Sequence, residues 1–265
     1  MTNLESISTF WATGDYHAVS LLIADLGPAI VAAAGVRSDH RVLDVGAGSG
    51  NATLPAARTG ASVTAVDPTA ELMEIGAKAA AAEGLDVTWC SGVAEALRFP
   101  DASFDVVLSC VGAMFAADQA GAAAELLRVC RPGGTVAMLS WTPAGGAGQL
   151  FELLGRHGAD HSGPNALAWG DPEHVRAMLG PGCTQLRTDI DEVGVRWSGT
   201  AAELAAHYLA DFAPVIRTAA ELDPAGVDAL RRDLTELFHG LDRGPADGPP
   251  RYVYEYLLAV GTRAP

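Results

Sequence analysis

Residues 42–51 read VLDVGAGSGN, an apolar run of strand length that leads into glycines at positions 46, 48 and 50. Glycine lets the backbone approach a ligand closely, and the helix expected after it would offer free N–H groups at its N-terminus. A dinucleotide fingerprint reads GxGxxG, whereas Asn51 stands where its third glycine is required. Asp44, two residues before the first glycine, suits a ligand that bears an ammonium group. The stretch predicts a ligand-binding loop, although a structural turn would show the same glycines.

On either side of this loop, apolar runs of strand length alternate with Ala-rich stretches of helix length. This alternation is typical of a parallel sheet covered by helices, because each parallel connection needs a crossover. The predicted strands are 41–45, 62–66, 86–90, 104–109 and 135–141, with helices at 52–58, 70–83 and 117–130. The sequence therefore predicts an α/β protein with a doubly wound parallel sheet.

The regular alternation of strand-length and helix-length segments ends at the Gly/Pro-rich segment TPAGGAG (142–148). The sequence beyond it predicts helices at 149–158, 172–179, 201–217 and 224–239 and strands at 185–197 and 251–260. We expect a sixth and a seventh strand that enclose a helical insertion, with N-terminal helices covering the same edge. We expect a single domain over residues 1–265, divided into a helical cap (1–39), a ligand-binding core (40–142) and a part with insertions (143–265).

Charge and cysteine content limit the classes of partner and site. The chain has 17 Lys and Arg against 32 Asp and Glu, a formal net charge of −15, and no basic run, so nucleic acid is not an expected partner. The four cysteines include no CxxC pair, which argues against disulfides and a zinc site. Neither a leader pattern nor an apolar run of about 18 residues is visible, so we expect a cytoplasmic protein without a membrane partner.

Four ordered segments together resemble the class I S-adenosylmethionine-dependent methyltransferases. The segments are DVGAGSG (44–50), AVDP (65–68), GVAEALRFPDASFDVVLS (92–109) and ELLRVCRPGGTVAML (125–139). The similarity is greatest to the small-molecule branch that includes the ubiquinone and menaquinone biosynthesis methyltransferases, and it covers roughly residues 40–142. It implies a Rossmann-like, mostly parallel seven-stranded sheet with helices on both faces and an antiparallel last strand.

The resemblance also implies which residues hold S-adenosylmethionine, with no metal required. Asp44 would hold the ammonium group of its methionine part, Asp67 would accept hydrogen bonds from both ribose hydroxyls, and Pro68 would pack on the adenine. The loop under the methionine part would be formed by Gly46, Ala47, Gly48 and Gly50. Apart from the resemblance, Asp44 and Asp67 also fit the simpler interpretation of capping or turn residues.

Two further positions belong to the same cofactor site. Related sequences usually carry an acid where this chain has Val93, so one hydrogen bond to the adenine amino group is lost, while the N–H of Ala94 still reaches the ring. Ser109 and Cys110 end the fourth strand, and ligands gather at the carboxyl edge of such sheets, so both are expected to line the cofactor.

The residues that bind and activate the methyl acceptor are less evident. TFWATGDYHAV (9–19) precedes the first strand and offers His17 as a general base and Tyr16 as a substrate contact, although a lone histidine is more often packed or exposed. His207 and Tyr208 form a second candidate pair, which an ordinary amphipathic helix would also explain. Trp141 either shapes the acceptor pocket or anchors the core.

Three functions stay open at this level. The first is methyl transfer from S-adenosylmethionine, with S-adenosylhomocysteine as product, to an O, N or C atom of a small molecule of natural-product or quinone type, by a monomer or homodimer. The second is a cyclase or scaffold protein that binds S-adenosylmethionine without methylating. The third, an NAD(P)-dependent oxidoreductase, is disfavoured by Asn51 and by the expected antiparallel last strand.

Overall fold

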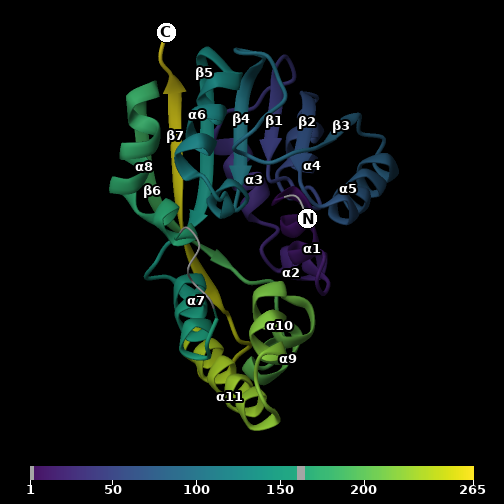
Figure 1. Cartoon of the computed structure of the whole chain (residues 1–265), viewed down its shortest axis with the longest axis vertical. Helices are drawn as coiled ribbons and strands as arrows, with labels where there is room; N and C mark the ends of the chain where they lie inside the picture. The colour runs from purple at the N-terminus through teal and green to yellow at the C-terminus, as the bar shows by residue number, and fades with distance from the viewer. Residues whose placement is uncertain (1–2, 160–164) are drawn as a thin grey trace.

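The computed structural model describes residues 3–159 and 165–265 and contains one mixed β-sheet (Figure 1). The sheet order is β3-β2-β1-β4-β5-β7-β6, in which β1 to β5 are parallel neighbours and β7 runs antiparallel to both β5 and β6. This is the predicted Rossmann-like arrangement with an antiparallel last strand. The strands are β1 (Arg41–Val45), β2 (Ser62–Asp67), β3 (Val87–Ser91), β4 (Phe104–Cys110), β5 (Cys130–Trp141), β6 (Cys183–Gly194) and β7 (Val253–Arg263).

Helices connect the strands and form a separate lobe below the carboxyl ends of the parallel strands (Figure 1). Those before or between the parallel strands are α1 (Asn3–Trp11), α2 (Tyr16–Leu22), α3 (Leu26–Ala33), α4 (Thr53–Arg58), α5 (Ala70–Ala82), the 3-10 turn η1 (Ala113–Phe115) and α6 (Gln119–Val129). After β5 come α7 (Gly146–Arg156), η2 (Ala166–Gly170), α8 (Pro172–Leu179), η3 (Gly180–Gly182), α9 (Ala201–Asp211), α10 (Ala213–Ala220) and α11 (Pro224–Leu241). The lobe consists of α7 and α9 to α11.

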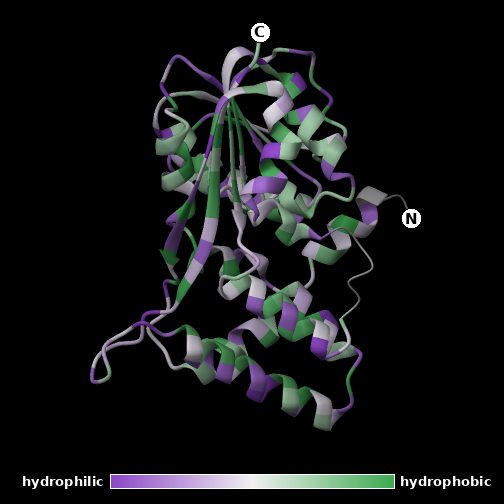
Figure 2. Cartoon of the chain, turned by 90° about the vertical axis from the view of Figure 1, so that its left-hand side faces the viewer, coloured by the Kyte–Doolittle hydropathy of each residue, from purple (hydrophilic) through white to green (hydrophobic). Residues whose placement is uncertain are grey.

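The core lies along the central strands. Leu43 of β1 and Val107 and Leu108 of β4 are fully buried, as expected for parallel strands covered on both faces. Figure 2 shows the same feature as hydrophobic colouring along the strands. The continuous apolar runs in the sequence therefore identify the centre of the sheet.

Several predicted boundaries were wrong. The helix predicted over 201–217 is two helices, because Pro214 in the first turn of α10 has no N–H to continue α9. Helix α7 begins at Gly146, inside the predicted break, and β5 begins at Cys130 rather than 135. In the described part of the chain, the N-terminal helices pack mainly away from the β6 edge, since α3 packs on α4, β4 and β5 while α2 contacts α5 and α9.

Within residues 3–159 and 165–265, no single helix is both long and apolar enough to cross a bilayer. Only α2 and α3, taken as a pair bent by 64°, have sufficient apolar length.

Candidate functional site

The glycine loop joins β1 to α4 and is fastened to the neighbouring strand. The N–H groups of Gly46 and Ala47 donate to the carbonyl oxygen of Val66 at 2.8 and 3.1 Å. Gly48 has a φ of +53°, and a Cβ atom added to it would meet no atom within 4 Å. The loop therefore holds its backbone in a left-handed conformation beneath open space, which is the geometry of a ligand cradle.

Asp44 lies one residue before the end of β1, with only 1% of its surface exposed. The hydroxyl of Thr53 donates to Oδ2 at 2.6 Å, while Oδ1 is buried with no hydrogen-bond partner in the described chain. Burial raises the pKa of Asp44 to about 6, and the hydrogen bond from Thr53 partly opposes this shift. A buried carboxylate oxygen without a donor is unfavourable, so it marks a position where a cationic group would be stabilised.

Asp67 ends β2 and faces the glycine loop. Its Oδ2 accepts a hydrogen bond from the N–H of Gly48 at 2.8 Å, and its Oδ1 accepts one from the N–H of Thr69 at 2.8 Å. Burial raises the pKa of the carboxyl, against the effect of these two bonds. The carboxylate is thus held in one orientation at the wall of the cavity above the loop.

This cavity brings together most of the residues predicted to bind the cofactor. Its lining includes Gly46, Gly48, Asp67, Pro68, Val93 and Ala94, together with Trp11, Tyr16 and Phe115. Ala47 and Cys110 line a small adjoining hollow that again includes Gly46 and Gly48. Gly50 lines neither space, because it packs against Leu54 and Trp89.

Val93 leaves the cavity wall apolar at the position where related sequences usually carry an acid. Glu95 also lines the cavity, but its Oε1 accepts the N–H groups of Ala117 and Asp118 at 2.6 and 3.2 Å. Glu95 therefore holds the loop before α6.

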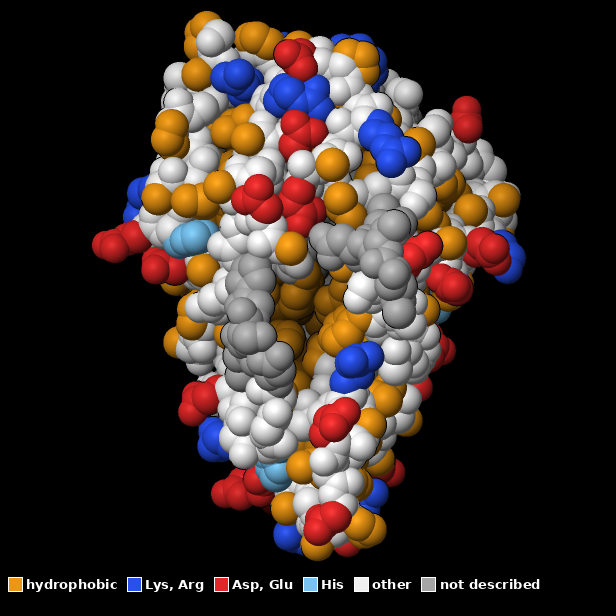
Figure 3. Space-filling view, viewed as in Figure 1, with side chains coloured by type: hydrophobic (Ala, Val, Ile, Leu, Met, Phe, Trp, Pro, Cys, Tyr) orange, Lys and Arg blue, Asp and Glu red, His pale blue; other side chains and the backbone are white. Residues whose placement is uncertain are grey.

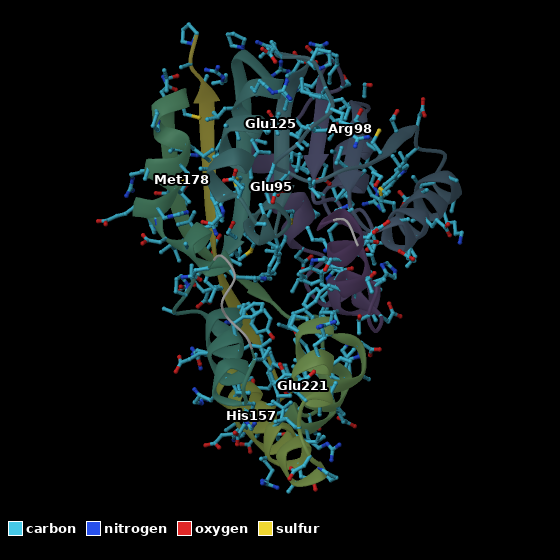
Figure 4. All side chains as sticks on the ribbon, in the orientation of Figure 1. Glu95, Arg98, Glu125, His157, Met178 and Glu221 are labelled. Carbon is cyan, nitrogen blue, oxygen red and sulfur yellow. The ribbon has the colours of Figure 1, made fainter. Side chains whose placement is uncertain are left out.

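A second, larger cavity of about 800 Å³ is lined by residues of α1, η1 and η2 and by residues of α7 and α10 of the helical lobe. Figure 3 shows its mouth as a hollow lined by hydrophobic side chains. Figure 4 labels one lining residue of each cavity: Glu95 of the first cavity and, nearer the tip of the helical lobe, Glu221 of the second. Trp11 and Phe115 line both cavities, and their rings meet edge to face at 4.8 Å between centroids.

Comparison with known proteins agrees with this geometry. A family described as a methyltransferase domain matches residues 43–138. An uncharacterized protein of Mycobacterium tuberculosis, Rv1405c, is 41% identical over 232 residues, covering 86% of this chain and 85% of its own. The demethylmenaquinone methyltransferase of Thermus thermophilus is 29% identical over 177 residues, covering 60% of this chain and 80% of its own. The solved structure of YcgJ from Bacillus subtilis has a TM-score of 0.60 at 21% identity, covering 91% of this chain and 99% of that one.

The chain belongs to the class I S-adenosylmethionine-dependent methyltransferases. Ser109, which was predicted to line the cofactor in this methyltransferase, lines none of the described cavities. Ser109 is 1% exposed, donates to the carbonyl oxygen of Val45 at 2.7 Å and accepts from the N–H of Ala113 at 2.8 Å. Its role is to fix the ends of β1 and β4 relative to η1.

His17 lies on α2, away from the lining of the described cavities. Its Nδ1 is 2.9 Å from the hydroxyl of Ser49, which in turn lies 3.2 Å from the hydroxyl of Ser20. This contact ties the N-terminal helices of the methyltransferase to the glycine loop. A general-base role for His17 stays a prediction.

Of the four residues predicted to bind the acceptor, three line a common cavity and one does not. Tyr16, Trp141 and Tyr208 line one small cavity between the two larger ones. His207 lines none of the described cavities, since it pairs with Asp211 at 2.8 Å and stacks on Trp197. Neighbours in sequence, His207 and Tyr208 face different surroundings because successive residues on a helix point about 100° apart.

Sequence reasoning missed several aromatic residues of this methyltransferase site. Phe115, Phe151 and Tyr254 line the cavities, and they come from η1, α7 and β7. Phe115 follows the carboxyl end of β4, a position where ligands gather, so its place after that strand was an available signal. The other two come from segments whose packing against the sheet no local pattern specifies.

Proposed function

We propose that this methyltransferase transfers the methyl group of S-adenosylmethionine to a small, largely apolar molecule bound in the 800 Å³ cavity. The observation that carries the proposal is the shared wall of the two cavities. Trp11 and Phe115 line both the space above the glycine loop and the larger cavity, so two ligands bound there would meet at these rings. The net charge of −15 disfavours a nucleic-acid acceptor.

The residues present fit the cofactor. The unpartnered Oδ1 of buried Asp44 offers a site for the ammonium group, and the open space above Gly48 leaves room for the methionine part. Asp67 presents a carboxylate to ribose hydroxyls, and Pro68 and Val93 provide apolar contacts for the adenine. When bound, S-adenosylmethionine supplies a sulfonium that carries an already activated methyl group.

The protein's part in the reaction is then mainly to position the acceptor and exclude water. Phe10, Trp11, Phe115, Phe151 and Leu167 supply the apolar walls of the larger cavity. Polar side chains stand among them, including Arg217, whose guanidinium lies 5.5 Å from the ring centre of Phe10. A cavity of this size and lining suits an aromatic or isoprenoid acceptor of quinone or natural-product type.

Calorimetric titration tests the cofactor first. We expect micromolar binding of S-adenosylmethionine and S-adenosylhomocysteine, no binding of NADH, and loss of at least tenfold in affinity in Asp67→Ala. Asp86→Ala, which removes an exposed carboxylate before β3, is the matched control and should bind as the native chain does. A preference for NADH would overturn the proposal.

The acceptor is tested by incubating the chain with S-adenosylmethionine and a panel of phenols, hydroquinones and aromatic amines. Mass spectrometry is expected to find a product that has gained one methyl group, together with S-adenosylhomocysteine. A product rearranged without an added methyl group would instead establish the cyclase alternative.

A further inference from the structure

A small cavity of about 30 Å³ lies where the cofactor and acceptor spaces join. It shares Tyr16 and Val111 with the cofactor cavity and Phe151 with the larger one. Three tyrosines contribute to its lining from separate elements: Tyr16 from α2, Tyr208 from α9 and Tyr254 from β7. The remaining lining is aliphatic or aromatic, so these hydroxyls dominate its hydrogen-bonding capacity.

The hydroxyls of Tyr208 and Tyr254 are 2.9 Å apart and buried, with 2% and 3% of each residue exposed. Two hydroxyl groups have two protons, and their mutual hydrogen bond uses one of them. The described residues provide no acceptor for the other. Tyr16, which is half-buried, lines the same cavity and could also donate to a ligand there. Buried donors are normally satisfied, so this end of the cavity lacks an acceptor atom that a ligand would bring.

These hydroxyls act as neutral donors. Burial raises the pKa of Tyr208 to about 12 and raises the pKa values of Tyr16 and Tyr254 above their usual range. Tyr16 lines the same small cavity as this pair. At neutral pH the group therefore donates hydrogen bonds and does not remove protons.

We propose that Tyr16, Tyr208 and Tyr254 bind an oxygen atom of the methyl acceptor. The acceptor is then an apolar molecule that inserts a carbonyl or hydroxyl oxygen between these residues while its body fills the larger cavity. This assignment rests on the proposed function for the place of the cofactor. A site built to donate to an oxygen discriminates against analogues that lack it, because its buried donors stay unpaired.

Three ligands with the same ring system test the assignment: naphthol, acetonaphthone and ethylnaphthalene. Equilibrium dialysis against the full chain is expected to give dissociation constants about 3- to 10-fold lower for the two oxygenated ligands than for ethylnaphthalene. Tight binding of naphthol alone would assign a hydroxyl group, whereas tight binding of both would assign any accepting oxygen. Equal affinities for all three, or no binding of any, would overturn the proposal.

Two variants connect this preference to the tyrosine pair. Tyr208→Phe and Tyr254→Phe are each expected to reduce the preference for the oxygenated ligands over ethylnaphthalene to less than twofold. Tyr252→Phe is the control, because its hydroxyl donates to the carbonyl oxygen of Gly199 at 3.2 Å and does not line these cavities. An unchanged preference in both pair variants, or an equal loss in the control, would overturn the assignment.

Titration with S-adenosylhomocysteine on the same preparations separates the two proposals. Normal binding of this ligand with no oxygen preference removes only the tyrosine assignment. If the native chain does not bind S-adenosylhomocysteine, the proposed function is wrong. The oxygen preference can still be measured in that case, because the dialysis experiment does not require this ligand.

Discussion

Gly46 and Gly112 pack backbone against backbone after the carboxyl ends of β1 and β4. A Cβ atom added to Gly46 would lie 2.6 Å from the Cα atom of Gly112, and one added to Gly112 would lie 2.6 Å from the carbonyl oxygen of Gly46. Because main chain meets main chain, neither side relaxes by rotating a side chain. Both residues line the cofactor cavity, so this contact brings its two sides together.

Alanine at Gly46 and at Gly48 is expected to have different effects. Gly46→Ala combines a φ of +72° with the clash and should lower the free energy of unfolding by about 3 kcal/mol or more. Gly48→Ala has a φ of +53° but open space around the new methyl group, so we expect a loss of about 1–2 kcal/mol. Urea denaturation measures both, and equal losses would contradict the proposed backbone contact.

Gly48→Ala is nevertheless expected to weaken cofactor binding. The added methyl group points into space that the cofactor would occupy, so calorimetry should show at least a tenfold loss of S-adenosylhomocysteine affinity. Gly84→Ala is the control, since that glycine also has a positive φ with open space around it but lies outside the cavities. Unchanged affinity in Gly48→Ala would place the ligand elsewhere.

The buried carboxyl of Asp44 predicts opposite effects of pH on stability and on cofactor binding. Its folded-state pKa of about 6 exceeds the ordinary 3.8, so the folded chain holds this proton more tightly than the unfolded chain. The contribution of this group to the free energy of unfolding therefore falls as the pH rises from about 4 to 6, by about 3 kcal/mol in total. Binding of an ammonium group requires the charged form, so S-adenosylhomocysteine affinity should fall as the pH decreases below 6.

Asp44→Asn removes that titration. At pH 7.5 the variant should be at least as stable as the native chain in urea, because no charge is buried, yet bind S-adenosylhomocysteine more than tenfold less tightly. Its affinity should also lose the pH dependence between 5 and 7. Native affinity in this variant would show that Asp44 does not hold the ammonium group.

Trp11 should report cofactor binding by fluorescence. Its indole lines the cofactor cavity and packs edge to face on Tyr16 at 5.1 Å and on Phe115 at 4.8 Å. We expect S-adenosylhomocysteine to change the emission of the native chain, and Trp11→Phe to lose most of this change while keeping affinity within about threefold. Trp197→Phe, which removes an indole stacked on His207, should keep the signal. A signal preserved in Trp11→Phe would contradict this placement.

The contact between His17 and Ser49 predicts a positioning effect. His17→Ala and Ser49→Ala should each weaken S-adenosylhomocysteine binding about 3- to 10-fold, because each removes the 2.9 Å contact with the glycine loop. The double variant should lose no more than either single one. A pure general base would instead leave affinity unchanged and abolish turnover, which a calorimetric and kinetic comparison distinguishes.

Local sequence patterns identified much of the cofactor side of the molecule. The apolar run before Gly46 and the loop glycines predicted a strand and a loop from local periodicity. Asp67 was assigned through the resemblance to the methyltransferases, and it lies at the same sheet edge because parallel strands place their carboxyl ends together. Ser109 was predicted to face the ligand, but its hydroxyl points to the carbonyl oxygen of Val45 instead. No feature of the sequence indicated that Gly112 would pack directly against the backbone of Gly46.

The acceptor side depended on tertiary packing. Tyr208 and Tyr254 are 46 residues apart, on a helix and on the last strand, and no spacing rule joins their hydroxyls. Phe151 and Trp11 likewise meet around cavities that exist only once the lobe packs against the sheet.

By itself, the sequence determined the α/β class and the glycine loop after the first strand, because these follow from periodicity and from residues close together in the chain. Its resemblance to the methyltransferases implied the seven strands, the antiparallel last strand and the roles predicted for Asp44 and Asp67. The tertiary structure alone decided which aromatic rings line the cavities, that Tyr208 lines one of them while His207 pairs with Asp211, and that the hydroxyls of Tyr208 and Tyr254 meet. Such contacts join segments distant in sequence, and their geometry is fixed by how the helices pack on the sheet rather than by any local preference.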